Sequence, residues 1–274
     1  MRWFPITLPV TRRWLSVLFL VCVVGAASLC ASCHPMRAKA ATAPKAATSN
    51  KVVYLTFDDG PNPLWTPYVL DILRRERVQA TFFVLGFRAQ KYPWLVRRIH
   101  REGHEIGNHG YYHTYIVHQN QRWVEAQVRR ADAAIEAACG VRPMYFRPPG
   151  GILNASNVRA VRKLGHPIAM WTVDTNDWRA TKAGPIVRVV ERDARPGSII
   201  LMHDGIDTSS RYTVQALPEV IRYLKQRGYT FAVLPEHYRG TRLGVPTAQG
   251  RPTTQAKRAS LSRLDRLDGR DGSQ

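Results

Sequence analysis

The stretch VVYLTFDDGP at residues 52–61 decides the fold class of this chain. Residues 52–57 form an apolar run with the length and β-branched composition of a buried strand. Two adjacent carboxylates, Asp58 and Asp59, follow it, and Gly60-Pro61 marks a turn directly after them. The turn can bring both carboxylates toward one cavity, although a plain strand-ending turn would need the same residue types.

A helix and a second strand are predicted beyond this turn. Residues 66–77 have the pattern of a helix capped by Thr66 with Pro67 in its first turn, and residues 80–85 that of a strand. The same alternation continues along the chain, with helices expected at 92–102, 123–139 and 216–227 and strands at 144–147, 168–174, 198–203 and 230–234. Strands that alternate with helices predict an α/β fold with a parallel sheet, either open or closed into a (β/α) barrel.

Polar residues stand where several of these strands end. Asp58-Asp59, Arg147, Asp174 and His203 each lie at the carboxyl end of a predicted strand. An α/β barrel builds its active site on that rim, and an open sheet would also gather the residues at one edge. We favour the barrel.

A metal site is predicted from two histidines and a carboxylate. His109 and His113 are four residues apart, which on a helical turn would place both imidazoles on one side, and Asp59 offers an oxygen ligand. An isolated histidine pair of this spacing is also common on surfaces and in cores. A zinc-protease motif fits poorly, because Gly110 stands where that motif carries its glutamate.

Acid and base candidates flank this metal site. Asp58 can accept a proton, with Arg147 as a positive charge beside it. His203 can donate one, with Asp177 or Asp174 as its carboxylate partner. A buried histidine that is bonded only to backbone would be the structural alternative for His203.

Five segments together resemble the motifs of the NodB-type polysaccharide deacetylases, carbohydrate esterase family 4. They are TFDDGPN from Thr56, NHGYYH from Asn108, FRPPGG from Phe146, DTNDW from Asp174 and LMHD from Leu201, and the resemblance spans residues 51–236. The resemblance implies a distorted (β/α) barrel and the following roles: Asp58 as base, Asp59, His109 and His113 as metal ligands, Arg147 orienting Asp58, His203 as acid, Asp177 tuning that acid, Trp178 walling the sugar groove, Leu201 shaping an acetyl pocket, and the Gly150 N–H serving the oxyanion.

Two departures from the family pattern lead to further expectations. Gly110 replaces the usual Ser or Thr after the first metal histidine, so a small hydrogen bond in the metal loop is expected to be missing. Gly150 replaces the aromatic residue that often follows RPP, so the sugar groove is expected to be more open.

The activity implied by the resemblance is metal-assisted removal of acetyl groups from an N-acetylated polysaccharide. Zn²⁺ is the divalent metal expected, and peptidoglycan or another envelope glycan is favoured as substrate. Two alternatives stay open: an O-acetyl esterase acting on xylan-type polymers, and a non-catalytic envelope-glycan-binding protein on the same fold.

The first fifty residues are predicted to direct export. Arg2, Arg12 and Arg13 precede an uncharged run at 14–31, and Ala38-Lys39-Ala40 offers a cleavage site. Residues 1–40 are therefore expected to form a cleaved signal peptide or an N-terminal membrane anchor, with lipoprotein attachment at Cys33 as a further possibility. Residues 41–50 would be a leader, and the protein would be periplasmic, extracellular or attached to the envelope.

Positive charge is concentrated outside the predicted catalytic domain, residues 51–238. The formal net charge is +20, and more than half of it lies in residues 1–50 and in the basic tail at 239–274, which is expected to be disordered. Such charge suits nucleic acid, but the chain carries no helix-turn-helix, finger or aromatic RNA-binding signature, so no nucleic-acid partner is expected. An anionic envelope polymer or membrane surface fits better.

Overall fold

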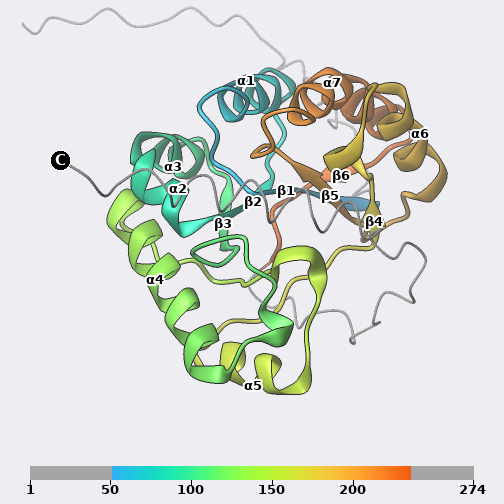
Figure 1. The fold of residues 1–274 in the computed structure, drawn as a ribbon. Coiled ribbons are helices and arrows are strands. Elements are labelled where there is room, and N and C mark those ends of the chain that lie inside the picture. Colours follow the sequence, from blue (N-terminus) through green and yellow to red (C-terminus); the bar gives the residue numbers. More distant parts are fainter. Residues whose placement is uncertain (1–50, 236–274) are drawn as a thin grey trace, which may run out of the picture. The chain divides into compact units, whose positions relative to one another are not determined.

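The computed structural model describes residues 51–235 (Figure 1). All of them lie in one of the two compact units into which the chain divides. The predicted signal or anchor, the leader and the basic tail lie outside the described residues. Within residues 51–235, no helix is both long enough and apolar enough to cross a membrane.

Parallel strands form the centre of the fold. They are β1 (Val52–Asp58), β2 (Thr81–Val84), β3 (Glu105–Asn108), β4 (Val173–Asp174), β5 (Ile199–His203) and β6 (Thr230–Phe231). Their order is β3-β2-β1-β5-β4, and β6 pairs with the first residues of β1. In the central register, Thr56 of β1 lies opposite Thr81 of β2 and Leu201 of β5.

The sheet is closed by two short extended stretches. Phe146 forms isolated parallel bridges to Asn108 at the end of β3 and to Ile168. The stretch that begins at Ile168 then reaches β5, where Thr172 N donates to Ile199 O at 2.9 Å. The ring therefore closes through residues 168–174, and the predicted distorted (β/α) barrel is confirmed.

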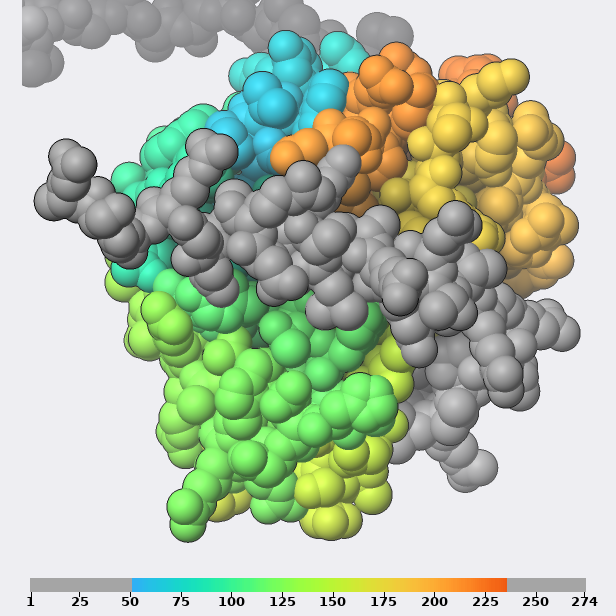
Figure 2. Space-filling view, viewed as in Figure 1, coloured from blue at the N-terminus to red at the C-terminus, as the bar shows by residue number. Residues whose placement is uncertain are grey.

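Helices surround the strands (Figure 1). Short 3₁₀ turns precede three of the helices along the chain. The helices are α1 (Thr66–Glu76), α2 (Gly86–Lys91), α3 (Pro93–Arg101), α4 (Gln121–Cys139), α5 (Ala155–Lys163), α6 (Gly184–Asp193) and α7 (Ser210–Gln226). The turns are η1 (Ile116–His118), η2 (Pro149–Gly151) and η3 (Asp177–Arg179). In the space-filling view α1 and α7 lie side by side (Figure 2).

Strand alternation separates the core from the site. Val53, Leu55 and Phe57 of β1 pack into the main hydrophobic cluster, together with Leu73 of α1 and Leu217 of α7. Because neighbouring side chains of a strand point to opposite faces, Thr56 and Asp58 point instead into the barrel. The same rule sends Leu201 and His203 inward from β5, so polar groups reach the inner face without disturbing the core.

Several local predictions were wrong. Thr66 is the first residue of α1 and does not cap it, because its hydroxyl accepts from Asn62 N at 2.7 Å and donates to Asp204. The strands predicted at 144–147 and 168–174 shrink to isolated bridges and to the two residues of β4. Helices α2, α5 and α6 and strand β3 were not predicted.

Candidate active site

The carboxyl ends of β1, β3 and β5 bring the predicted residues to one rim. Asp59 has φ of 70°, so the chain leaves β1 in a left-handed turn, and both carboxylates can approach the same imidazole. His109 Nε2 lies 3.7 Å from Asp58 Oδ2 and 3.4 Å from Asp59 Oδ1. The turn after β1 thus brings the two carboxylates together, as the sequence indicated.

Three ligand atoms converge beside this turn. Asp59, His109 and His113 each offer one, all within 4.8 Å of one another, and His113 Nε2 lies 3.4 Å from Asp59 Oδ1. That carboxylate oxygen is buried and has no hydrogen-bond partner within residues 51–235. An orphaned buried oxygen facing two imidazoles is the arrangement a divalent cation would complete.

The tautomer of His109 supports the fit to a cation. Its Nδ1 lies 2.8 Å from the carbonyl oxygen of Arg147, which can only accept, so Nδ1 carries the proton. In the neutral ring, Nε2 therefore presents a lone pair toward Asp59. A bond from the outer nitrogen to a backbone carbonyl is the usual support of a metal-ligating histidine.

The pKa shifts of His113 and Asp59 suit the other two candidate ligands. Burial lowers the pKa of His113, which favours the neutral imidazole that can bind a metal. For Asp59, burial raises the pKa, but the charges of His113 and His203 and the interaction with His109 outweigh it and hold the pKa far below its usual value. Asp59 is therefore an anion, as a ligand must be.

The loop that carries the two histidines is not the helical turn that the four-residue spacing suggested. Residues 109–115 form an irregular loop after β3, with φ of 86° at Gly110, a conformation that favours glycine. Gly110 has no hydroxyl to donate, so the expected loss of a side-chain hydrogen bond stays a prediction; its backbone N donates to Asn108 Oδ1 at 2.6 Å. Asn108 thereby fixes the loop.

Buried polar residues that were not predicted hold Asn108 in turn. Its Nδ2 donates to Asp132 Oδ1 at 2.7 Å and to Val128 O at 2.9 Å on α4. Asp132 Oδ2 lies 2.8 Å from His166 Nε2, whose other nitrogen lies 2.9 Å from Met144 O. Asn108 could have been suspected from its place beside His109, but no sequence motif marks Asp132 or His166.

Asp58 is oriented by a fully buried arginine. Arg147 Nη1 donates to Asp58 Oδ1 at 2.7 Å and to Thr56 Oγ1 at 2.8 Å, and its Nε donates to Ala169 O at 3.0 Å. The guanidinium also lies 3.9 Å from the centre of the Phe83 ring. One oxygen of Asp58 is thus held, and the other faces the metal ligands.

His203 is paired with Asp177 and not with Asp174. Its Nδ1 lies 2.7 Å from Asp177 Oδ1, while Asp177 Oδ2 accepts from His203 N at 2.7 Å and from Thr213 Oγ1 at 2.6 Å. Asp174 instead accepts from Asn176 N in a local turn. Thr213, on α7, is a further partner that the sequence did not reveal.

This pairing changes the acidity of the imidazole. Burial lowers the pKa of His203, but the charge and hydrogen bond of Asp177, with smaller contributions from Asp59 and Asp58, raise it to about 10. His203 therefore carries a proton at neutral pH. A protonated imidazole at the rim can act as a general acid.

Gly150, Leu201 and Trp178, the predicted substrate-binding residues, lie in three different surroundings. Leu201 is buried inside the barrel opposite Thr56, and Trp178 is half-buried in η3 next to Asp177. Gly150 has φ of 67°, and a Cβ built on it would lie 2.3 Å from Cε1 of Tyr115. The Tyr115 ring therefore occupies the space directly beside the α-carbon of Gly150, and the expected opening of the sugar groove stays a prediction.

A sequence model of the polysaccharide deacetylase family matches residues 45–169. A peptidoglycan-N-acetylglucosamine deacetylase of Bacillus cereus is 38% identical over 190 residues, which cover 69% of this chain and 88% of the relative. The chain belongs to the polysaccharide deacetylase family. As a polysaccharide deacetylase it is an enzyme, and its family depends on a metal ion.

Two other members extend this similarity. A chitooligosaccharide deacetylase of Sinorhizobium fredii is 41% identical over 207 residues, which cover 72% of this chain and 96% of the relative. A family 4 acetyl xylan esterase from Clostridium thermocellum, solved in complex with a cobalt ion, is 34% identical with a TM-score of 0.65, over 69% of this chain and 89% of that one. The family therefore includes both N-deacetylases and O-deacetylases.

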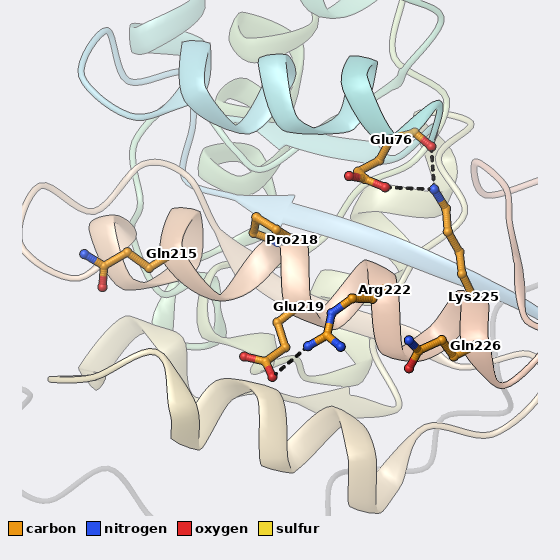
Figure 3. Close-up of a pocket in the computed structure, with 7 residues that line it drawn as sticks. All are labelled: Glu76, Gln215, Pro218, Glu219, Arg222, Lys225 and Gln226. Carbon is orange, nitrogen blue, oxygen red and sulfur yellow. Dashed lines mark hydrogen bonds and ion pairs between the residues drawn. The ribbon is translucent and has the colours of Figure 1, made fainter.

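A surface groove on α1 and α7 contains none of the predicted catalytic, metal-binding or substrate-binding residues. Its volume is about 460 Å³, and it is lined by Glu76, Gln215, Pro218, Glu219, Arg222, Lys225 and Gln226 (Figure 3). Its charges are paired, Lys225 with Glu76 at 2.9 Å and Arg222 with Glu219 at 3.2 Å. The predicted site residues lie at the barrel rim, outside this groove.

Proposed function

We propose that this polysaccharide deacetylase removes N-acetyl groups from N-acetylglucosamine residues of a polysaccharide, with peptidoglycan or another envelope glycan as the favoured substrate. One observation carries the proposal: the oriented carboxylate Asp58, the triad of Asp59, His109 and His113, and the Asp177–His203 pair lie on one rim. The names of the relatives, which act on peptidoglycan and chitooligosaccharides, support this substrate class.

Asp58 is the proposed base. A divalent cation held by Asp59, His109 and His113, Zn²⁺ in our proposal, would acidify a water molecule and polarise the acetyl carbonyl. Asp58 Oδ2 faces these ligands and can take the proton of the attacking water, while Arg147 holds Oδ1.

His203 is the proposed acid. Its Nδ1 donates to Asp177, so the proton on Nε2 can pass to the amide nitrogen of the sugar as the C–N bond breaks. The Gly150 N–H would stabilise the negative charge on the former carbonyl oxygen. Acetate and a glucosamine unit leave, with Leu201 beside the acetyl methyl and Trp178 along the sugar in the proposed arrangement.

An O-acetyl esterase is the second candidate, favoured by the similarity to the acetyl xylan esterase. The same residues would serve it, because attack at an ester carbonyl needs the same base and the same oxyanion support. A binding protein without activity is disfavoured, since residues able to serve as base, acid and three metal ligands are all present.

The surrounding segments complete the proposal. Residues 1–40 would export the protein or anchor it through the N-terminus, 41–50 would link, 51–238 would be the catalytic domain, and 239–274 would be a basic tail. An exported deacetylase would meet its glycan in the cell envelope, as expected for relatives named after peptidoglycan.

Acetate release tests the proposal. The purified protein should release acetate from peptidoglycan and N-acetylglucosamine oligomers, lose this activity with a chelator, and regain it best with Zn²⁺ when several divalent ions are compared. Release from acetylated xylan alone would establish the esterase instead. Metal binding without any acetate release would favour the binding role.

A further inference from the structure

The ring of Tyr115 lies directly over Gly150. A Cβ built on Gly150 would meet three atoms of that ring, Cε1 at 2.3 Å, Cδ1 at 3.0 Å and Cζ at 3.4 Å. Real Cβ atoms do not approach carbon this closely, so residue 150 can have no side chain while the ring is there. The ring thus stands in the place of a side chain on Gly150.

The chain is anchored directly after Tyr115 by two contacts. Ile116 is buried in a hydrophobic cluster with Phe146, the residue before Arg147. Asn154, four residues after Gly150, donates through Nδ2 to Val117 O at 2.8 Å. The position of the ring relative to Gly150 is therefore set by packing and a hydrogen bond.

The ring also lies beside the metal ligands. Its centre is 6.0 Å from that of His113, at an angle of 68° between the planes. Tyr115 is only half-buried, so part of its surface faces solvent next to the triad. A half-exposed aromatic face at this point can receive the apolar C–H face of a sugar ring, with the hydroxyl left to bond its polar groups.

We propose that Tyr115 is a substrate-positioning residue, whose ring forms the wall of the subsite for the N-acetylated sugar that reacts. The inference rests on the proposed function, since it assumes a sugar bound at this rim. The ring comes from the loop of His113 while the oxyanion donor comes from Gly150, so one sugar would touch both segments.

The alternative is that Tyr115 only supports His113. In that case removal of the ring would disturb the metal site for every substrate alike. A sugar wall predicts a different result, namely a loss of glycan affinity that is present without metal and larger for sugar substrates than for a small ester.

Three variants separate the two roles. Tyr115→Leu keeps apolar bulk without an aromatic face, Tyr115→Phe keeps the ring without its hydroxyl, and Trp94→Leu removes a half-exposed aromatic ring from the surface of α3 as control. For each, the binding of an N-acetylglucosamine tetramer to the metal-free protein is measured by calorimetry, bound zinc by elemental analysis, and kcat and KM for the tetramer and for 4-nitrophenyl acetate.

We expect Tyr115→Leu to weaken tetramer binding and raise KM by about tenfold, the value of a lost aromatic contact. The loss of kcat/KM should be about tenfold larger for the tetramer than for the ester, Tyr115→Phe should restore most of the affinity, and Trp94→Leu should behave as wild type. Equal losses for both substrates together with lost zinc would overturn the proposal, as would unchanged tetramer binding in Tyr115→Leu.

Failure of the proposed function would look different. The wild-type protein itself would then release no acetate from the tetramer. The calorimetric comparison of wild type with Tyr115→Leu does not depend on turnover, so it would still decide whether Tyr115 contacts the sugar.

Discussion

The metal side and the acid side of the site are built in opposite ways. On the metal side, the buried oxygen of Asp59 faces His109 and His113 without a hydrogen bond from any described residue. On the acid side, Asp177 accepts three hydrogen bonds, from Nδ1 and N of His203 and from Thr213. A cation would satisfy the first arrangement, and described residues alone satisfy the second.

This contrast separates the two requirements of catalysis. Asp177 holds the donor and does most to raise its pKa, with smaller contributions from Asp59 and Asp58. On the other side, the three candidate ligand atoms lie close enough for one cation to join them. Each half should therefore respond to a different perturbation.

Loss of a ligand should have the largest effect. His109→Ala should abolish acetate release and metal binding, because outer partners of metal ligands already contribute about 10–100-fold and a ligand contributes more. Added zinc should raise the melting temperature of wild type but not of the variant. His118→Ala, an exposed histidine in η1, is the control and should keep both properties. Metal binding by His109→Ala would contradict the assigned triad.

Asp177→Asn should break the acid side and spare the metal side. Without the Asp177 charge, the pKa of His203 should fall from about 10, so the acid loses its proton at a lower pH. Acetate release should drop about a hundredfold near neutral pH, with the alkaline limb of the pH profile moved to lower pH. Bound zinc should remain as in wild type.

The same pair has a signature in stability. Because its folded pKa is raised above the ordinary value near 6.5, His203 stabilises the fold fully below that value, and this contribution is lost as pH rises through about 10. Asp177→Asn should therefore lower the free energy of unfolding more at pH 6 than at pH 11. An equal loss at both pH values would contradict the charged pair.

Asp132→Asn should give a smaller effect, on the metal side alone. It weakens the support that Asp132 gives to Asn108 and thereby to the loop of His109. We expect zinc affinity to fall by about tenfold, as is typical for outer partners, with the alkaline limb of the pH profile left in place. A shift of that limb would show that the two sides are not independent.

The groove on α1 and α7 should give the smallest effect. Lys225→Met breaks the partly exposed ion pair with Glu76 (Figure 3). Such pairs contribute about 0–1 kcal/mol to stability, and the groove holds no residue of the site. Acetate release should stay at the wild-type level in a parallel assay with Asp132→Asn, and any tenfold loss would place function in this groove.

The sequence predicted the parts of the fold that carry strong apolar patterns. Strands β1 and β5 were located because burial requires them to be continuously apolar, and α4 because its apolar residues recur at helical spacing. Strand β3 was missed because EIGN is short and holds a glycine, which the structure needs since a Cβ on Gly107 would lie 2.4 Å from the Phe83 ring. Helix α6 was missed because its Gly184-Pro185 start has the residues of a turn.

The site was predicted as far as its motifs reach. Each candidate near the triad was named from a segment in which chemistry restricts the residue type, as in the paired aspartates before Gly60. Thr213, Asp132 and His166 could not be named, because their roles depend on which helix packs behind the rim. The position of Tyr115 could not be predicted for the same reason, because its contact with Gly150 joins two loops that are 35 positions apart in the sequence.

The stretch at 168–174 closes the barrel, and it also connects the residues that hold Asp58 and His203. Its first residues provide Ala169 O for Arg147, the guanidinium that holds Asp58, and its last pair with β5 just before the turn that carries Asp177. Asp58 and His203 themselves lie opposite each other in β1 and β5, so the stretch sets how their supports, Arg147 and Asp177, lie relative to this pair. An insertion or deletion there would displace the supports even though neither Asp58 nor His203 was altered.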